Sequence, residues 1–460
     1  MDASLSYGLI SLIPVVVVIA MALITKRTLE SLVVGSLVGF IILRGTGFLG
    51  AWVATAQEVF SESAWFIWVF GVFGMVIMLL EKSGGAQGIS QLGTKFAKTR
   101  GAALLATWVL GILIFIDDYL NNLGVSVAMR NVTDKFKVSR ELLAYLINST
   151  GAAVCVLVPI SSWAVFMSGI YDSLGITGSN GTSLGAYIQS IPYMFYAWIA
   201  VVMAPLIIFK IIPIYGPMKK AELRAAGGEV FPDSYYERLK KNDIEELKEE
   251  MDPSKAKAMN FIFPMVVFVA ATILTNGDIL MGGIITVILC GIMYIPQKLM
   301  TISEFCDTSF KGFTSMAFVT GLVLISFMLT KVNDELGLTP YIINKVEPLL
   351  SPALLPMITF FLVAFLAFAC GSFWGIIAIV APIIIPLAQA LDCNVFLIGA
   401  AMISGTVFAS HTCFYADAVT LISQGTQIQN IDYARTAIPI AVIPVVLSGI
   451  MFLIFGFMMA

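Results

Sequence analysis

The stretch FIDDYLNNLG, residues 115–124, places two carboxylates and two amides directly after a strongly apolar run. That run, ALLATWVLGILI at 103–114, has the composition of the middle of a membrane helix. A carboxylate at bilayer depth costs at least about 2.5 kcal/mol, and chains normally accept this cost where an ion or a proton passes. The stretch therefore predicts a polar site inside a membrane protein.

The composition of the whole chain also indicates a polytopic membrane protein. Of its 460 residues, 59% are hydrophobic and only 12% are charged, which excludes an ordinary soluble globule. The net charge is −3, and the sequence has no basic face for nucleic acid. Lys26 and Arg27 follow the apolar run at 12–25 and no small-residue cleavage site does, so we expect this run to stay as the first transmembrane helix.

Catalytic and cofactor motifs are missing from the sequence. The six cysteines are scattered without a C-x-x-C pair, so we expect neither a disulfide framework nor a resident metal site. His411 is the single histidine, and no Gly-x-Ser-x-Gly elbow accompanies it. There is also no P-loop and no nucleotide fingerprint. The sequence thus predicts no enzyme, no cofactor and no ATP-driven pump.

Hydropathy divides the chain into apolar spans on either side of one polar segment. The segment at 216–257 holds nine Lys/Arg, which predicts a cytoplasmic loop because orientation follows Lys and Arg rather than net charge. It separates a first membrane repeat, 1–215, from a second, 258–460. The predicted spans lie near 8–25, 30–44, 64–80, 102–116, 123–130, 142–174, 187–213, 258–275, 279–295, 312–330, 354–369, 372–390, 396–428 and 436–459.

The sequences of the two membrane segments resemble each other, as expected for an internal repeat. PVVVVIAMALIT at 14–25 matches PMVVFVAATILT at 264–275, with an offset of 250 residues. MLLEKSGGAQGI at 78–89 matches FMLTKVNDELGL at 327–338, with an offset of 249. Internal repeats are typical of secondary transporters. The alternative is that any two apolar helices resemble each other.

The Lys and Arg residues predict a re-entrant hairpin in the first repeat. Four lie in 82–101 and four in 130–140, so both segments should be cytoplasmic, although 102–130 lies between them. A single crossing cannot begin and end on the same side. We therefore expect 102–116 to enter the membrane and 123–130 to return, with IDDYLNN as the turn.

The second repeat predicts an equivalent hairpin at 354–390, with its turn at CGSFWG, 370–375. Few Lys or Arg flank it, so both of its ends should lie outside. Each repeat then has five transmembrane helices and one re-entrant hairpin, and five is odd, so the second repeat is inverted. The predicted fold is an all-α polytopic membrane protein with two inverted repeats, whose hairpin tips meet near midplane as alternating access requires.

Four polar clusters are candidates for the ion or substrate site. They lie at the first hairpin turn, in a broken helix after it, at the second hairpin turn, and in a second broken helix. The candidate residues are Asp117, Asp118, Asn121 and Asn122; Asn148, Ser149, Thr150, Ser161 and Ser162; Ser372; and Ser404, Thr406, His411 and Asp417.

Each cluster also has a structural interpretation. Adjacent helix residues point roughly 100° apart, so one of Asp117 and Asp118 can bind cargo while the other binds a helix end or a Lys/Arg; alternatively, both cap the returning helix. The Ser and Thr hydroxyls can bond within their own helix, and small residues can serve close packing. His411 and Asp417 are plausible proton carriers, but they can instead be a packing histidine and the partner of a Lys or Arg.

At these residues the chain resembles NhaC-type sodium/proton antiporters, within the ion transporter superfamily. The motifs that carry the resemblance are FIDDYLNNL, STGAAVCVLVPISSW, GSFWG and the H-x5-D of ASHTCFYADAVTL, in this order, and it covers about 60–430. The resemblance implies scaffold and transport domains, a homodimer, an elevator-like motion, and sodium exchange coupled to protons. It implies site roles for Asp117, Asp118, Asn121, Ser149, Thr150, Ser372, His411 and Asp417.

The chain departs from the family pattern at five positions. Asn148 and Ser410 stand where the family often has Asp, and Val154 stands where it often has Pro. Phe414 and Tyr415 replace smaller or turn-forming residues. The site has therefore lost two carboxylates and gained two aromatic rings, and aromatic faces suit an organic cation or an amino acid.

Three functions are compatible with these patterns. The first is proton-coupled sodium antiport, in which Asp117 or Asp118, together with Asp417, binds transported Na⁺ or a proton but not both. The second is sodium- or proton-coupled transport of a small organic solute such as an amino acid or a carboxylate. The third is a channel or a structural membrane protein, which the repeat disfavours. We expect the cell inner (cytoplasmic) membrane as the location and the lipid bilayer as a partner.

Overall fold

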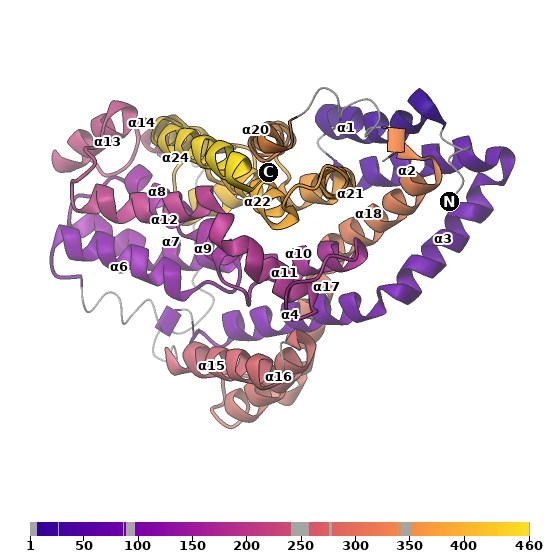
Figure 1. The fold of residues 1–460 in the computed structure, drawn as a ribbon. Coiled ribbons are helices and arrows are strands. Elements are labelled where there is room, and N and C mark those ends of the chain that lie inside the picture. The colour runs from indigo at the N-terminus through magenta and orange to yellow at the C-terminus, as the bar shows by residue number, and fades with distance from the viewer. Residues whose placement is uncertain are drawn as a thin grey trace.

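The protein is all-helical in the computed structural model, which describes residues 7–25, 27–85, 87–88, 97–240, 257–275, 278–338, 340–341 and 351–459 (Figure 1). Every regular element within these ranges is an α-helix or a short 3₁₀ turn. Eight helical stretches there are long and apolar enough to cross a membrane, and two bent helix pairs raise this number to ten. The predicted class, an all-α polytopic membrane protein, is confirmed.

Helices lie on both sides of the polar segment. The first half contains α1 (Ile13–Thr25), α2 (Thr28–Arg44), α3 (Phe48–Glu62), α4 (Ala64–Lys82), α6 (Arg100–Leu113), α7 (Asp118–Lys135), α8 (Arg140–Asn148), α9 (Gly151–Leu157), α10 (Ser162–Ser173), α11 (Ser183–Ser190) and α12 (Phe195–Ile208). The second contains α15 (Met259–Leu274), α16 (Ile279–Tyr294), α17 (Ile302–Ser315), α18 (Ala317–Glu335), α20 (Leu355–Cys370), α21 (Phe373–Ala390), α22 (Val395–Thr412), α23 (Asp417–Thr426) and α24 (Asn430–Met459). The internal repeat and the inverted relation of the halves stay predictions.

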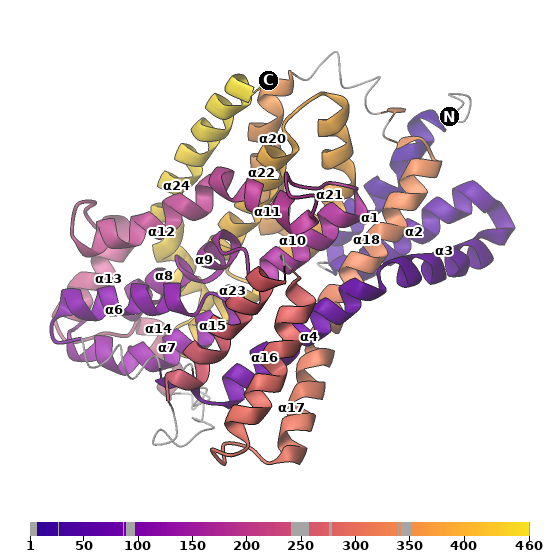
Figure 2. The ribbon, with the colours of Figure 1, turned by 60° about the horizontal axis from the view of Figure 1, so that its bottom comes forward.

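The helices pack as two groups. The first group is α1–α4 with α15–α18, and the second is α6–α12 with α20–α24 (Figure 2). Contacts between the groups run chiefly through α10, which touches α4 and α18, and through α21, which touches α2 and α18. These seams are where a relative movement of the groups would change contacts.

Hairpin 1 is formed by α6 and α7, which pack against each other. Its turn is shorter and earlier than predicted: it occupies 114–117, and Asp118 to Asn122 are already helical. The returning arm is therefore Asp118–Lys135 rather than 123–130. Asp117 explains the shift, because its carboxylate accepts bonds from the Tyr119 and Leu120 amides at 3.0 and 3.1 Å and so starts the helix there.

Hairpin 2 is formed by α20 and α21 with Gly371 and Ser372 between them. Gly371 has φ +68°, a left-handed conformation that favours glycine, and it ends α20. The Tyr415 hydroxyl donates to the Phe368 and Ala369 carbonyls at the end of this helix. The predicted turn at 370–375 is thus correct in place but covers fewer residues.

The two predicted broken helices are present. The first runs through α8, α9 and α10 with interruptions at 149–150 and 158–161, and its last part bends by 41°. The second runs through α22 and α23 with an interruption at 413–416. Each break leaves a helix N-terminus, that of α10 or α23, beginning inside the protein rather than at its end.

The polar segment contributes two helices, α13 (Gly216–Ala226) and α14 (Asp233–Lys240), and part of it, 241–256, lies outside the described residues. Glu222 of α13 accepts from the Ser139 amide at 2.9 Å and pairs with Arg100 at the start of α6. Arg224 pairs with Glu141 at 2.7 Å. The open end of hairpin 1 therefore lies against α13, and we name this end of the molecule the linker face.

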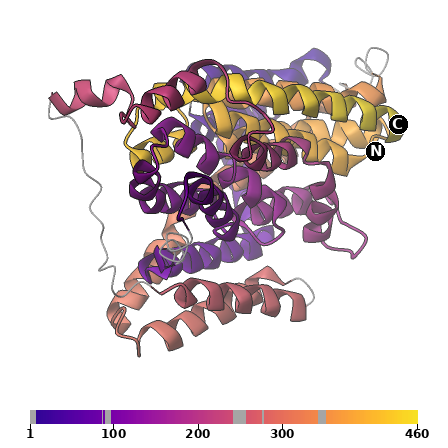
Figure 3. The same ribbon diagram turned by 90° about the vertical axis from the view of Figure 1, so that its left-hand side faces the viewer.

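The second hairpin opens at the other end of the molecule, the opposite face. Cys393 after α21 lies 3.5 Å from the Pro352 carbonyl, just before α20, and Ala353 contacts Gly456 near the end of α24. At its start, α24 contacts the polar segment, because the Ser234 hydroxyl of α14 donates to the Asp432 carboxylate. Figure 3 shows α13 at the left and the C-terminus at the right. The hairpins thus open toward opposite ends of α24.

The sequence spans missed two helices. No span covered 48–62, where α3 lies, and the span at 312–330 joined parts of α17 and α18. Glu58 and Glu62 of α3 pair with Lys331 of α18 at 2.8 and 2.9 Å, and Arg44 pairs with Glu335 at 2.5 Å. Acidic residues lower the hydropathy of these helices, so the apolar pattern did not define them as separate spans.

Candidate functional site

The candidate site forms where the first hairpin turn meets the start of α10. The Ser162 amide donates to the Ile116 carbonyl at 3.0 Å, and the Ser162 hydroxyl lies against the Asp117 carboxylate. Ser161 caps α10 by accepting from the Ala164 amide at 3.2 Å. The turn and the break in the first broken helix are therefore joined through backbone and side-chain contacts.

Asp117 and Asp118 have different surroundings, as their positions on the helix predict. Asp117 is used as the cap of α7. Asp118 is only 1% exposed, and neither of its carboxylate oxygens has a hydrogen-bond partner in the part of the chain that the structure describes. The Trp163 indole faces Asp118, but its N–H does not reach hydrogen-bond geometry. Asp118 is thus the acid of this pair that is left to bind something else.

Two amides share the face of α7 that carries Asp118, because they follow it by three and four residues. The Asn121 amide donates to the Gly111 and Ile114 carbonyls at 2.5 and 2.8 Å and so closes the end of α6. Within the described ranges, the Asn121 side-chain oxygen has no hydrogen-bond partner, and neither does any polar atom of the Asn122 side chain. Gly151 allows this closeness, since a Cβ there would stand 2.1 Å from the Asn122 oxygen.

Aromatic side chains join the second hairpin to this site. Trp374 of α21 stacks on Trp163 of α10 with ring centroids 4.4 Å apart, and Phe166 packs edge-on against Trp374 at 4.8 Å. The Tyr119 side chain also lies beside Trp374. The side chains of the two hairpin tips therefore meet, as alternating access requires.

Asp417 begins α23 and lies close to the same site. Its side chain is exposed, and the Tyr119 hydroxyl faces it. No Lys or Arg among the described residues makes an ion pair with Asp417. Tyr119 thus lies between an exposed acid and the buried Asp118.

His411 lies in a separate cage of hydroxyl groups. Its Nδ1 is 3.0 Å from the Tyr196 hydroxyl and its Nε2 is 3.3 Å from the Ser149 hydroxyl, while the Tyr145 ring stacks on it at 5.3 Å. His411 belongs to the last turn of α22 and Asp417 begins α23, so the two residues lie on either side of the break at 413–416. The surroundings of His411 fit a packing histidine.

The other candidate residues hold mostly structural positions. Asn148 donates to the Tyr433 hydroxyl at 2.8 Å and leaves its own oxygen unpaired. Ser149, Thr150 and Thr406 bond to carbonyls of their own helices. Ser372 lies 3.2 Å from Thr28 of α2 rather than at Asp118, and Ser404 is buried with an unpaired hydroxyl.

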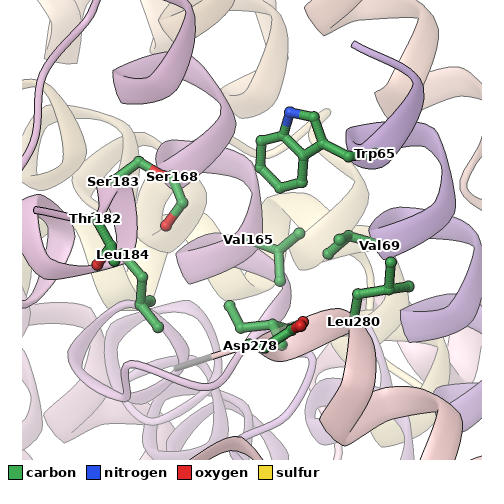
Figure 4. A pocket seen from close by; sticks show the side chains of 10 residues that line it. Trp65, Val69, Val165, Ser168, Thr182, Ser183, Leu184, Asp278 and Leu280 are labelled. Atoms are coloured by element: carbon green, nitrogen blue, oxygen red, sulfur yellow. The ribbon is translucent and has the colours of Figure 1, made fainter. Parts of the chain in front are cut away.

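A cavity of about 310 Å³ lies away from Asp118, between α4 and α16 on one side and α10 and α11 on the other (Figure 4). Trp65, Val165, Ser168, Leu184 and Asp278 are among the side chains that line it. It therefore lies on a seam between the two helix groups.

The comparisons with known proteins identify the family. The sequence model of the Na⁺/H⁺ antiporter family matches residues 154–457, which is more than half of the chain. The chain belongs to this family. An uncharacterized protein of Haemophilus influenzae is 25% identical to it over 487 aligned positions, which cover 97% of this chain and 91% of that relative.

Two solved structures resemble this antiporter-family fold. The YdaH transporter of Alcanivorax borkumensis, whose topology is described as unusual, matches with a TM-score of 0.53, at 14% identity over 90% of each chain. MtrF of Neisseria gonorrhoeae, described as illuminating a class of antimetabolite efflux pumps, matches with a TM-score of 0.48, at 13% identity, over 88% of this chain and 85% of its own. As a member of the Na⁺/H⁺ antiporter family with eight to ten helices that can cross a membrane among its described residues, the protein is a multi-pass secondary transporter rather than an enzyme.

For this antiporter-family member, sequence reasoning missed three aromatic residues of the site. Tyr119, Trp163 and Trp374 are all inside motifs that carry the resemblance, DDY, ISSW and GSFWG. The sequence signal that could have identified them is an aromatic residue next to intramembrane acids or next to a helix break.

The described residues of this family member contain no group of three His, Cys, Asp or Glu that could hold a metal. The orphaned oxygens of Asp118, Asn121 and Asn122 have the hard-oxygen chemistry that suits an alkali or alkaline-earth cation.

Proposed function

We propose that this protein exchanges Na⁺ for protons across the membrane, with Asp118 as the acid that both ions share. The expectation that Asp117 binds the ion is revised, since Asp117 is engaged as a helix cap. Asn121 and Asn122 supply further oxygens, and Asp417 is the exposed acid next to the route.

One observation supports this proposal above the others: a buried carboxylate with no hydrogen-bond partner, beside amide oxygens that also lack partners. Burying an unpaired polar group costs about 1–3 kcal/mol, and an unpaired charge costs more. A bound cation or a proton on Asp118 removes this cost, and the two exclude each other on one carboxylate. Competition at a single acid, combined with alternating access, gives antiport.

The inverted repeats, the division at 216–257, the homodimer, the cytoplasmic linker face and the inner-membrane location belong to the same proposal. The opposed openings of hairpins 1 and 2 support the inversion. Nine Lys/Arg in the polar segment support a cytoplasmic linker face.

Purified protein in liposomes tests the proposed antiport. An imposed pH gradient should collapse when Na⁺ is added, and Asp118→Asn should abolish this response while the variant still folds. Glu30→Gln is the matched control, since Glu30 is an exposed acid that pairs with Arg27 at the surface. A wild-type protein whose pH gradient ignores Na⁺ and Li⁺ would refute the proposal.

A second candidate is coupled transport of a small organic solute. The observation that favours it is the set of aromatic rings near Asp118 and Asp417, with Trp163, Trp374 and Phe414 among them. Thermal stabilisation of the purified protein by amino acids, amines and carboxylates tests this candidate. Stabilisation by Na⁺ or Li⁺ alone would count against it.

A further inference from the structure

The cavity at Trp65, Ser168 and Asp278 contains a feature that packing does not explain. Ser168 is 4% exposed, its hydroxyl has no hydrogen-bond partner among the residues that the structure describes, and Figure 4 shows this side chain among those that line the cavity. A buried hydroxyl without a partner costs free energy, so its position indicates a ligand or water. The volume of about 310 Å³ is in the range of small-ligand sites.

The charge of the cavity selects cations. Among the described residues, Asp278 is its single ionisable lining residue, and it lies exposed at the start of α16, with one oxygen bonded to the Met281 amide at 2.9 Å. The hydroxyls of Ser168 and Ser183 add oxygen atoms, the Thr182 hydroxyl is bonded to Asn180 and Gly185, and none of the described lining residues is a Lys or Arg. Oxygen donors around one acid suit a hydrated monovalent cation.

The position of the cavity along α10 shows on which side of the Asp118 site it lies. The broken helix α8–α10 starts at the linker face, where Arg140 lies beside Asp134 at 2.6 Å, and it runs through Ser162 toward the opposite face. Ser168 follows Ser162 by six residues, about 9 Å along a helix axis. The buried Val165 lies between these positions. The cavity therefore begins one to two helical turns beyond the Asp118 site, on the side away from α13.

We propose that this cavity is the entrance for Na⁺ on the opposite face, with Asp278 attracting the cation and Ser168 receiving it before it passes Val165. This inference rests on the proposed function for the identity of the cation. It places a second cation subsite on the seam between the two helix groups, where their relative movement opens or closes the passage beside Val165.

Cysteine accessibility tests the entrance without requiring transport. Ser168→Cys should react with a membrane-impermeant, positively charged methanethiosulfonate added at the opposite face, over the background of the wild-type cysteines. Ser448→Cys is the matched control: Ser448 is equally buried, but its hydroxyl is bonded to the Pro444 carbonyl of α24, so this cysteine should stay unreactive. Sidedness is set by adding the reagent inside or outside vesicles of known orientation.

A second measurement tests the role of the Asp278 charge in the proposed entrance. Asp278→Asn should slow labelling of Ser168→Cys by the cationic reagent about tenfold, the low end of electrostatic steering, and should leave labelling by a neutral reagent unchanged. The same variant should raise the Na⁺ concentration for half-maximal exchange only when Na⁺ is supplied at the opposite face. Three results would each refute the proposed entrance: equal labelling of the two cysteines, labelling only from the linker face, or an unchanged rate of labelling by the cationic reagent in Asp278→Asn.

The two proposals fail differently. If wild-type protein shows no Na⁺-dependent proton flux but Ser168→Cys is labelled as expected, the antiport is wrong and the cavity admits another cation. If the flux is present and the labelling is not, the antiport stands and this entrance is refuted.

Discussion

Asp117 and Asp118 show how one residue step separates a structural acid from a functional one. Asp117→Asn should keep both stability and exchange, because Asn caps helices about as well as Asp. Asp117→Ala should lose about 1 kcal/mol of unfolding free energy with the cap. Asp118→Asn should lose exchange and keep its melting temperature. Thermal unfolding in detergent measures stability, and the liposome assay measures exchange. Loss of exchange in Asp117→Asn would show that Asp117, after all, binds the ion.

His411 gives a second prediction at the residue scale. His411→Phe should lower the unfolding free energy by about 1–3 kcal/mol, because the buried Tyr196 and Ser149 hydroxyls lose their partner. His411→Gln keeps a polar group in the cage and should lose less. The pH profile of exchange should be the same in both variants and the wild type. A displaced profile in the stable Gln variant would make His411 a proton carrier after all.

At the scale of elements, the end of hairpin 2 depends on one glycine. Gly371→Ala should lower stability, since a left-handed residue other than glycine costs about 1–2 kcal/mol. The added methyl would also stand 2.8 Å from the ring of Tyr415, whose hydroxyl donates to the Ala369 carbonyl at the end of α20. Gly124→Ala, inside α7 with open space around its Cβ, should be neutral or stabilising by up to about 1 kcal/mol. Melting temperatures of the two variants that shift equally would contradict this account.

The sequence allowed the hairpins to be predicted but not their boundaries. Basic segments on both sides of 102–130 required a hairpin, while the apolar pattern could not reveal that Asp117 caps α7 and moves the turn to 114–117. Likewise, His411 and Asp417 lie six residues apart in the chain, yet each turns to partners from distant helices, Tyr196 and Tyr119. Such contacts depend on tertiary packing, which local patterns do not contain.

At the scale of the whole molecule, ion pairs connect the polar segment to the membrane part. Arg224→Ala should cost about 3 kcal/mol, the low end for breaking a buried pair, because Glu141 is 3% exposed while Arg224 is itself partly exposed. Adding Glu141→Gln should restore part of this loss by removing the unpaired charge. Thermal unfolding of both single variants and the double variant measures the coupling, and additive effects would show that the pair does not hold the segment.

The two hairpins differ in what completes the carbonyl end of their first helix. In hairpin 1 it is Asn121, a residue of the hairpin itself. In hairpin 2 it is Tyr415, which belongs to the break between α22 and α23. Hairpin 1 therefore keeps these bonds when it moves, and its turn is joined to the first broken helix through the bond from the Ser162 amide to the Ile116 carbonyl. Hairpin 2 can keep its bonds only when it moves together with the second broken helix, so each hairpin is tied to a different broken helix.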